Sequence, residues 1–316
     1  MFMRSPRARP LAVISLLVLV VGIAAYLVAR PYLPGRQPGI TLPSILPSFN
    51  LPSEEASGSP LPSPKTLVAV GDIGSCDSEA DEAVADLAQR LDGLVASLGD
   101  TVYESGSDQE FAQCFDPAWA PMKSRIRPAV GNHEYETDGA AGYFDYFGSA
   151  AGARGEGWYS YDYGGWHVVV LNSNCGAVGC DPGSPQLQWL AHDLARADPA
   201  CLLAYWHHPR WSSGRHGSNA FVQPFWDELE RYGVDVILNG HDHDYERILV
   251  NGVREFVVGT GGRSIYSFTK RELPTTEARS DRAYGALWLE LAPGAYGWRF
   301  VALGDSGFQD TGSGTC

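Results

Sequence analysis

The sequence predicts an α/β fold that starts near residue 66, and two observations carry this prediction. Short apolar runs alternate with segments of helical periodicity, which is typical of strands connected by helices that lie outside the sheet. After residue 245 strands dominate, which indicates a second sheet packed on the first. The composition, 44% hydrophobic and 19% charged, is that of a globular protein and excludes general disorder.

The elements follow in order along the chain. Residues 79–91, 185–197 and 221–232 have apolar side chains at helical spacing, and each is expected to be a helix. Residues 158–163 and 167–172 are expected to form a hairpin around Gly164 and Gly165. The other predicted strands are 66–70, 94–98, 126–130, 202–206, 234–238, 248–250, 255–258, 286–291 and 298–303.

The N-terminal part predicts a membrane anchor. Residues 11–29 are nineteen uncharged, mostly apolar residues preceded by Arg4, Arg7 and Arg9. As a helix they would span roughly 28 Å, close to the thickness of the hydrocarbon core of a bilayer. The positive-inside rule then makes residues 1–10 a cytoplasmic tail and places the body outside the cytoplasm at the cell membrane. The alternative is a signal sequence whose cleavage leaves a secreted protein, although the apolar stretch of a signal is usually about 7–15 residues.

Residues 30–64 are expected to be a linker between this segment and a single domain at residues 65–316. Nine prolines and six serines fall within residues 31–64, a composition that favours an extended, semi-rigid tether.

Six cysteines follow the predicted anchor: Cys76, Cys114, Cys175, Cys180, Cys201 and Cys316. An even number in an exported chain favours disulfides, and the absence of a CxxC pair argues against a zinc ribbon. Cys175 and Cys180 are predicted to pair across a short glycine-rich loop. The pairing of the other four remains open at the level of sequence.

The formal net charge of −14 excludes some classes of partner. Binding to nucleic acid through its phosphates needs a basic face, so no nucleic-acid role is expected. The same charge disfavours docking of the main body on anionic lipid. Contact with the membrane is therefore expected only through the N-terminal segment, and no obligate protein partner is predicted.

Polar side chains follow five of the predicted strands: Asp72, Asp100, Asn132 with His133, His207, and His241 with His243. In α/β folds ligands gather beyond the carboxyl ends of the strands, so these side chains are expected to converge. They are too many for one tetrahedral ion. Two cations that share one aspartate would use them all.

At this point the sequence resembles a known family. GDIG (71–74), GDTVY (99–103), GNHE (131–134), HHP (207–209) and GHDHDYER (240–247) look like the calcineurin-like metallophosphoesterase signature, in particular its purple acid phosphatase branch. The resemblance runs from about Val68 to Gly262. It implies an α/β/β/α sandwich of two packed mixed sheets flanked by helices, which makes residues 65–316 a catalytic domain.

The resemblance also implies a pair of metal ions. Asp72, Asp100, Tyr103 and His243 would hold the first ion, and Asp100, Asn132, His207 and His241 the second. Many members of the family have a histidine where this chain has Gly74, and Tyr103 replaces that lost ligand. A phenolate favours a hard trivalent cation, so Fe(III) is expected in the first site and divalent Fe, Zn or Mn in the second.

The activity implied by the resemblance is hydrolysis of phosphate monoesters of small molecules by attack of a metal-activated hydroxide. His133 is the first choice for the proton donor to the leaving alcohol. His216 is assigned to substrate contact or proton donation, and Glu134 is expected to orient His133.

Three other histidines are given structural interpretations. His167 lies in a hairpin strand among apolar neighbours, and His192 is expected to face solvent. His208 is expected to point away from the site, because neighbouring strand residues face opposite sides.

Two alternative functions remain at this stage. The same pair of metal ions would also serve a phosphodiesterase or a nucleotide hydrolase. A non-catalytic binding module on a decayed scaffold is the third reading, which the complete set of seven ligands disfavours.

Overall fold

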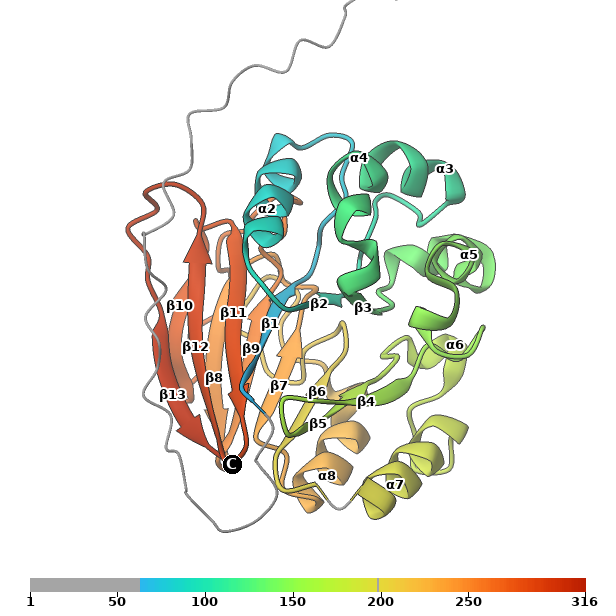
Figure 1. Ribbon diagram of the computed structural model, residues 1–316, viewed down its shortest axis with the longest axis vertical. Helices are drawn as coiled ribbons and strands as arrows, with labels where there is room; N and C mark the ends of the chain where they lie inside the picture. Colours follow the sequence, from blue (N-terminus) through green and yellow to red (C-terminus); the bar gives the residue numbers. More distant parts are fainter. Residues whose placement is uncertain (1–62, 198) are drawn as a thin grey trace, which may run out of the picture. The chain divides into compact units, whose positions relative to one another are not determined.

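Two mixed β-sheets packed face to face form the centre of the protein (Figure 1). The computed structural model describes residues 63–197 and 199–316. Helix α2 lies beside β11 of one sheet, and α7 and α8 lie beside the other (Figure 1). The predicted arrangement of two mixed sheets flanked by helices is confirmed.

The first sheet has six strands, in the order β13-β12-β11-β1-β2-β3. Its strands are β1 (Lys65–Val70), β2 (Leu94–Leu98), β3 (Ile126–Ala129), β11 (Gly285–Ala292), β12 (Ala295–Ala302) and β13 (Thr311–Thr315). The second has seven, in the order β10-β8-β9-β7-β6-β5-β4. Its strands are β4 (Tyr159–Tyr163), β5 (Trp166–Val170), β6 (Leu202–Tyr205), β7 (Val236–Asn239), β8 (Tyr245–Val250), β9 (Val253–Val258) and β10 (Thr276–Ser280).

The helices of the described residues are α2 (Glu79–Arg90), α3 (Asp108–Glu110), α4 (Asp116–Trp119), α5 (Ala141–Phe147), α6 (Cys175–Val178), α7 (Pro185–Ala197) and α8 (Gln223–Arg231). Shorter or irregular turns connect them, among them η1 (Phe111–Phe115), η2 (Ala120–Arg125), η3 (His133–Glu136) and η6 (Ala220–Val222). Helix α2 begins where Ser78 accepts a hydrogen bond from the Ala80 N–H, which satisfies a free donor of the first turn. Helices α2 and α7 were predicted within one residue at each end.

The expectation that the later strands form a sheet of their own is wrong. Strand β11 pairs antiparallel with β1, while β8 and β9 join the parallel strands β5, β6 and β7. The C-terminal strands are thus divided between the two sheets. Pairing with β11 covers the edge of β1 that would otherwise expose unpaired backbone groups.

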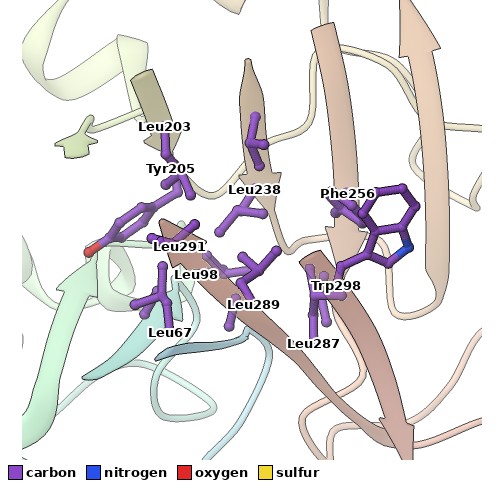
Figure 2. Packing of buried hydrophobic residues seen from close by; sticks show 14 of the residues in the cluster. Leu67, Leu98, Leu203, Tyr205, Leu238, Phe256, Leu287, Leu289, Leu291 and Trp298 are labelled. Atoms are coloured by element: carbon purple, nitrogen blue, oxygen red, sulfur yellow. The ribbon is translucent and has the colours of Figure 1, made fainter. Parts of the chain in front are cut away.

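The main core lies between the two sheets (Figure 2). Leu67 and Leu98 from one sheet face Leu203, Leu238 and Phe256 from the other, and all five are fully buried. A second core lies between the seven-stranded sheet and its helices, where α7 contributes Leu187, Leu190 and Leu194. The seven-stranded sheet is therefore packed on both of its faces, by the other sheet on one side and by helices on the other.

Strands β10 and β13 were not predicted. Their sequences, TEARS and TGSGT, lack the apolar alternation that indicates a strand. Both lie at the edge of a sheet, where polar residues are tolerated because one side faces solvent.

All six cysteines form disulfides: Cys76–Cys114, Cys175–Cys180 and Cys201–Cys316. The predicted Cys175–Cys180 pair is confirmed. Cys201–Cys316 joins the C-terminal residue to the residue that precedes β6, so it ties one sheet to the other.

The predicted anchor at residues 11–29 and the linker up to residue 62 lie outside the described residues. Within the described residues, no helix has the length and apolar character needed to cross a membrane.

His167 in β5 joins two elements through its side chain. Its Nδ1 is 2.8 Å from Asp162 Oδ1 in β4, and its Nε2 is 3.0 Å from Asp193 Oδ2 in α7. The hydrogen bond with Asp193 raises the pKa of His167, and the hydrogen bond with Asp162 adds to this against the effect of burial. The predicted structural role is confirmed, as is the exposure of His192.

We expect His167→Gln to lower the free energy of unfolding by about 2 kcal/mol below pH 6, because two charge-assisted hydrogen bonds are lost. The pKa of His167 is raised by folding, so its contribution is fully present below the unfolded pKa of about 6.5. The contribution is lost as the pH rises through the higher folded value. Urea unfolding of both proteins between pH 5 and pH 9 measures this. A difference in stability that stays constant over that range would contradict the prediction.

Candidate metal centre

The polar side chains predicted to converge do so at the end of the two packed sheets. Asp72 follows β1, Asp100 follows β2 and Asn132 follows β3, all from the six-stranded sheet. His207 and His241 follow β6 and β7 of the seven-stranded sheet. The site therefore takes its residues from both sheets.

Four side chains form a first ligand group around the phenolic oxygen of Tyr103. Tyr103 Oη is 2.9 Å from Asp72 Oδ1, 3.0 Å from Asp100 Oδ2 and 3.3 Å from His243 Nε2. His243 Nε2 is also 3.3 Å from Asp72 Oδ1. These are the residues predicted for the first ion.

Four side chains form a second ligand group around Nε2 of His207. This nitrogen is 3.1 Å from Asn132 Oδ1, 3.3 Å from Asp100 Oδ1 and 3.2 Å from His241 Nδ1. All seven predicted ligands therefore belong to one group or the other. Asp100 belongs to both, with Oδ2 in the first group and Oδ1 in the second.

Backbone carbonyls orient two of the imidazoles. His207 Nδ1 is 2.9 Å from the Leu98 carbonyl oxygen, and His243 Nδ1 is 2.7 Å from that of Ser264. A carbonyl only accepts hydrogen bonds, so Nδ1 carries the proton in both rings. Each Nε2 then faces its ligand group, which is the orientation that a metal ligand requires once this nitrogen carries no proton.

The backbone is held in an unfavourable conformation at three of the ligands. Asp72, Asp100 and His241 have φ values of 59°, 47° and 71°. Residues other than glycine are uncommon in this left-handed region, and such residues cluster at functional sites. Gly131 has no side chain because a Cβ there would overlap the backbone nitrogen of Asp100.

Burial and charge set the protonation of the group. Burial opposes ionisation of Asp100, but the adjacent His207 outweighs it and lowers the pKa of Asp100 below its usual range. The same pairing raises the pKa of His207 to about 9 against the effect of burial. Burial lowers the pKa of His241 well below the ordinary value, and neighbouring imidazoles lower it further. His241 is therefore neutral and able to donate a lone pair.

The donor set fits a pair of hard or borderline cations. It consists of carboxylate, phenol, amide and imidazole groups, with no sulfur. Buried carboxylates at Asp72 and Asp100 would repel each other without compensating charge. Cations held by the two groups would remove that repulsion.

The two predicted catalytic histidines flank the ligand groups. His133 Nδ1 is 2.6 Å from the Glu104 carbonyl oxygen, and its Nε2 is 3.9 Å from Asp100 Oδ2. The ring of His216 lies 4.5 Å from that of His241, between the centroids. Both side chains are thus brought to the site, His133 beside Asp100 and His216 beside His241.

Glu134 does not orient His133 as expected. Its buried carboxylate accepts hydrogen bonds from the N–H groups of Thr101 and Gly131, at 2.6 and 2.7 Å, and from Val102 at 3.1 Å. It therefore ties the segment after β2 to the segment after β3. The side chain points back into the turn, because these three buried donors have no other partner among the contacts described.

The expectation that His208 points away from the site is also wrong. Its ring nitrogen lies within 4.8 Å of the ligand nitrogens of His207 and His241. The alternation rule fails because β6 ends at Tyr205, so residues 206–208 are no longer strand.

Three neighbours of the ligand groups were not found from the sequence. Tyr266 stacks on His243 with the ring centroids 4.2 Å apart, and the Arg263 guanidinium lies 4.9 Å from the Tyr103 ring centroid. Asp242 accepts hydrogen bonds from the N–H groups of His216 and Gly217. Only Asp242 had a signal, its place between two ligands in GHDHDYER.

Comparison with known proteins identifies the family of this chain. Residues 65–245, more than half of the chain, match the calcineurin-like phosphoesterase family. The chain belongs to this family.

Its relatives include purple acid phosphatases. The chain is 26% identical over 226 residues to purple acid phosphatase 15 and 29% identical over 231 residues to purple acid phosphatase 23, both from Arabidopsis thaliana. Each match covers 60% of this chain but only 42% and 50% of the relative, so the chain spans about half their length. A purple acid phosphatase from yellow lupin seeds has the same fold, with a TM-score of 0.66 and 19% identity over 80% of this chain and 54% of the lupin chain.

We expect Glu134→Ala to lower the stability of the protein by about 3 kcal/mol, because three buried N–H groups lose their acceptor. Metal content should fall as well, since these N–H groups belong to the segments that carry Asp100 and Asn132. Thermal unfolding and metal analysis of the purified protein measure both effects. Glu136→Ala, an exposed residue of the same turn, is the matched control. Wild-type metal content and stability in Glu134→Ala would contradict this role.

Proposed function

We propose that the protein is a metal-dependent phosphatase that hydrolyses phosphate monoesters at the two ligand groups. The observation that carries the proposal is the position of Asp100, whose two carboxylate oxygens face the two groups separately. A shared carboxylate of this kind suits a pair of cations. Such a pair polarises phosphate oxygens and lowers the pKa of bound water, which is the chemistry of phosphate ester hydrolysis.

The first group is proposed to hold Fe(III). Burial raises the pKa of Tyr103 well above the ordinary value, and the charges of Asp100 and Asp72 raise it further. A strongly charged cation is therefore needed to displace the phenolic proton. The second group offers an amide, two imidazoles and the shared carboxylate, so a divalent Fe, Zn or Mn ion is proposed there.

His133 is proposed to move the proton that the leaving alcohol requires. Its Nδ1 donates to the Glu104 carbonyl oxygen, which leaves Nε2 facing the centre. A proton on Nε2 is positioned for transfer to an ester oxygen bound there. His216, on the side of His241, is proposed to contact the phosphate group.

Location outside the cytoplasm is part of the proposal. Three disulfides in one domain are typical of an oxidising compartment. Attachment to the membrane through residues 11–29 is proposed from the sequence.

We expect Asp100→Asn to reduce kcat/KM on an aryl phosphomonoester by on the order of 10³-fold, because an amide has only one oxygen and cannot face both groups as an acceptor. Phosphate release by the metal-loaded protein measures this. Asp86→Asn, on the exposed face of α2, is the control and should keep wild-type activity. Wild-type turnover in Asp100→Asn would refute the proposed function.

The same assay distinguishes the monoesterase from the alternative phosphodiesterase or nucleotide hydrolase. Rates on an aryl monoester and on a bis-aryl diester are compared with the wild-type protein. We expect the monoester to be hydrolysed at least tenfold faster in kcat/KM. A faster diester would make the protein a phosphodiesterase at the same site.

We expect the purified protein to be coloured by charge transfer from the Tyr103 phenolate to Fe(III). Tyr103→Phe should lose the visible absorption band while keeping the fold, which far-UV circular dichroism checks. A colourless wild-type protein that contains two divalent ions would refute the iron assignment but not the hydrolase.

A further inference from the structure

A cavity of about 560 Å³ lies beside the second ligand group. Asn132 lines both the cavity and that group, so the two are continuous. The volume lies within the range of pockets that bind small molecules. We call it the Phe221 cavity, after the residue at its rim, and its walls include Tyr135, Glu136, Cys175 and His208.

His208 forms the wall between the ligand group and the rim. Its ring centroid is 4.4 Å from that of His241 and 5.4 Å from that of Phe221. Its Nδ1 is hydrogen-bonded to Ser173 Oγ at 2.8 Å, which fixes the ring. A group that leaves the second ligand group along His208 therefore reaches Phe221.

The side chain of Phe221 is unusually exposed for a large hydrophobic residue. Within the described residues it is the one large hydrophobic side chain that is exposed, with 45% of its surface accessible. Exposed apolar surface at the edge of a cavity marks binding sites more often than apolar surface elsewhere. Tyr135, which also lines the cavity, is held by a 2.8 Å hydrogen bond that its hydroxyl accepts from Asn172.

The charge of the walls limits the occupant. Among the described residues that line the cavity, Glu136 is the single carboxylate, and none is lysine or arginine. A second phosphate or a carboxylate on the substrate would meet Glu136 without a compensating cation. The walls instead offer the rings of Phe221, Tyr135 and His208.

We propose, on the basis of the proposed function above, that the Phe221 cavity binds the alcohol part of the phosphate monoester. The occupant is a single uncharged aromatic ring that packs against Phe221. Ring pairs are favoured over an aliphatic group of equal size by about 3- to 10-fold in affinity. The substrate class is therefore a monophosphate ester of a neutral aromatic alcohol.

Two probes test the aromatic preference with the full-length, metal-loaded protein. Benzyl phosphate and cyclohexylmethyl phosphate have a similar size and release alcohols of similar acidity, so their intrinsic reactivities are matched. We expect the wild-type protein to favour benzyl phosphate about 3- to 10-fold in kcat/KM. Phe221→Leu should reduce this ratio to about one, and Phe221→Trp, which keeps a ring, should retain it.

A variant of another residue that lines the cavity tests the location independently of Phe221. Ala177→Trp in α6 fills the cavity, because Ala177 lines it. We expect kcat/KM to fall for benzyl phosphate but to stay within about twofold for methyl phosphate, which does not reach the cavity. Unchanged metal content and circular dichroism show that the variants are folded.

A third comparison tests the charge of the walls. We expect 4-carboxybenzyl phosphate to be a poorer substrate than benzyl phosphate, and Glu136→Gln to reduce the difference about 2- to 5-fold. A difference that Glu136→Gln leaves unchanged would overturn the role given to this carboxylate.

The outcomes separate this inference from the proposed function. Hydrolysis of methyl phosphate with no ring preference, or a ring preference that survives both Phe221→Leu and Ala177→Trp, overturns the cavity assignment and leaves the phosphatase standing. No release of phosphate from any of the esters by the metal-loaded wild-type protein overturns the proposed function itself.

Discussion

The shared carboxylate of Asp100 is the constraint on which the rest of the site depends. Its two oxygens are useful only if the carboxylate keeps one orientation, and several features hold it there. The residue has a φ of 47°, the N–H of His133 donates to Oδ1 at 3.0 Å, and Gly131 leaves room for the backbone nitrogen. Glu134 then ties the segments on either side together. Much of the local sequence is therefore explained by the position of one side chain.

The site also depends on the packing of the two sheets. The six-stranded sheet supplies Asp72, Asp100, Tyr103 and Asn132, while His207, His241 and His243 come from the seven-stranded sheet. Their mutual distances are therefore set by the core between the sheets, where Leu98 of β2 faces Leu238 of β7 (Figure 2). Protein interiors are close-packed and transmit strain. Substitutions that change the volume of this core are therefore expected to shift the side chains of the ligand groups. Stability and metal binding are coupled through the same contacts.

The convergence of the seven side chains was predictable from sequence because their signal is local. Each follows a short apolar strand, and the carboxyl ends of such strands are where side chains gather in an α/β fold. The division of the C-terminal strands was not predictable, because nothing in 286–291 indicates that β11 pairs with β1 rather than with β9. His208 and Glu134 were misread for a related reason. Their directions depend on where β6 ends and on which N–H groups of a distant loop need an acceptor, and neither is encoded within a few residues.

The contrast between the ligand groups and the Phe221 cavity is a contrast between two kinds of constraint. The ligands are held by backbone geometry, buried charge and the carbonyls of Leu98 and Ser264, so few substitutions are compatible with them. The cavity is built from residues of loops and short helical turns outside both sheets, and one wall is the segment that the Cys175–Cys180 disulfide closes. Side chains on this segment can be substituted without moving the ligand groups. Chemistry at the strand ends and the proposed selection of the alcohol are therefore largely separable, because Asn132 is the one proposed ligand that also lines the cavity.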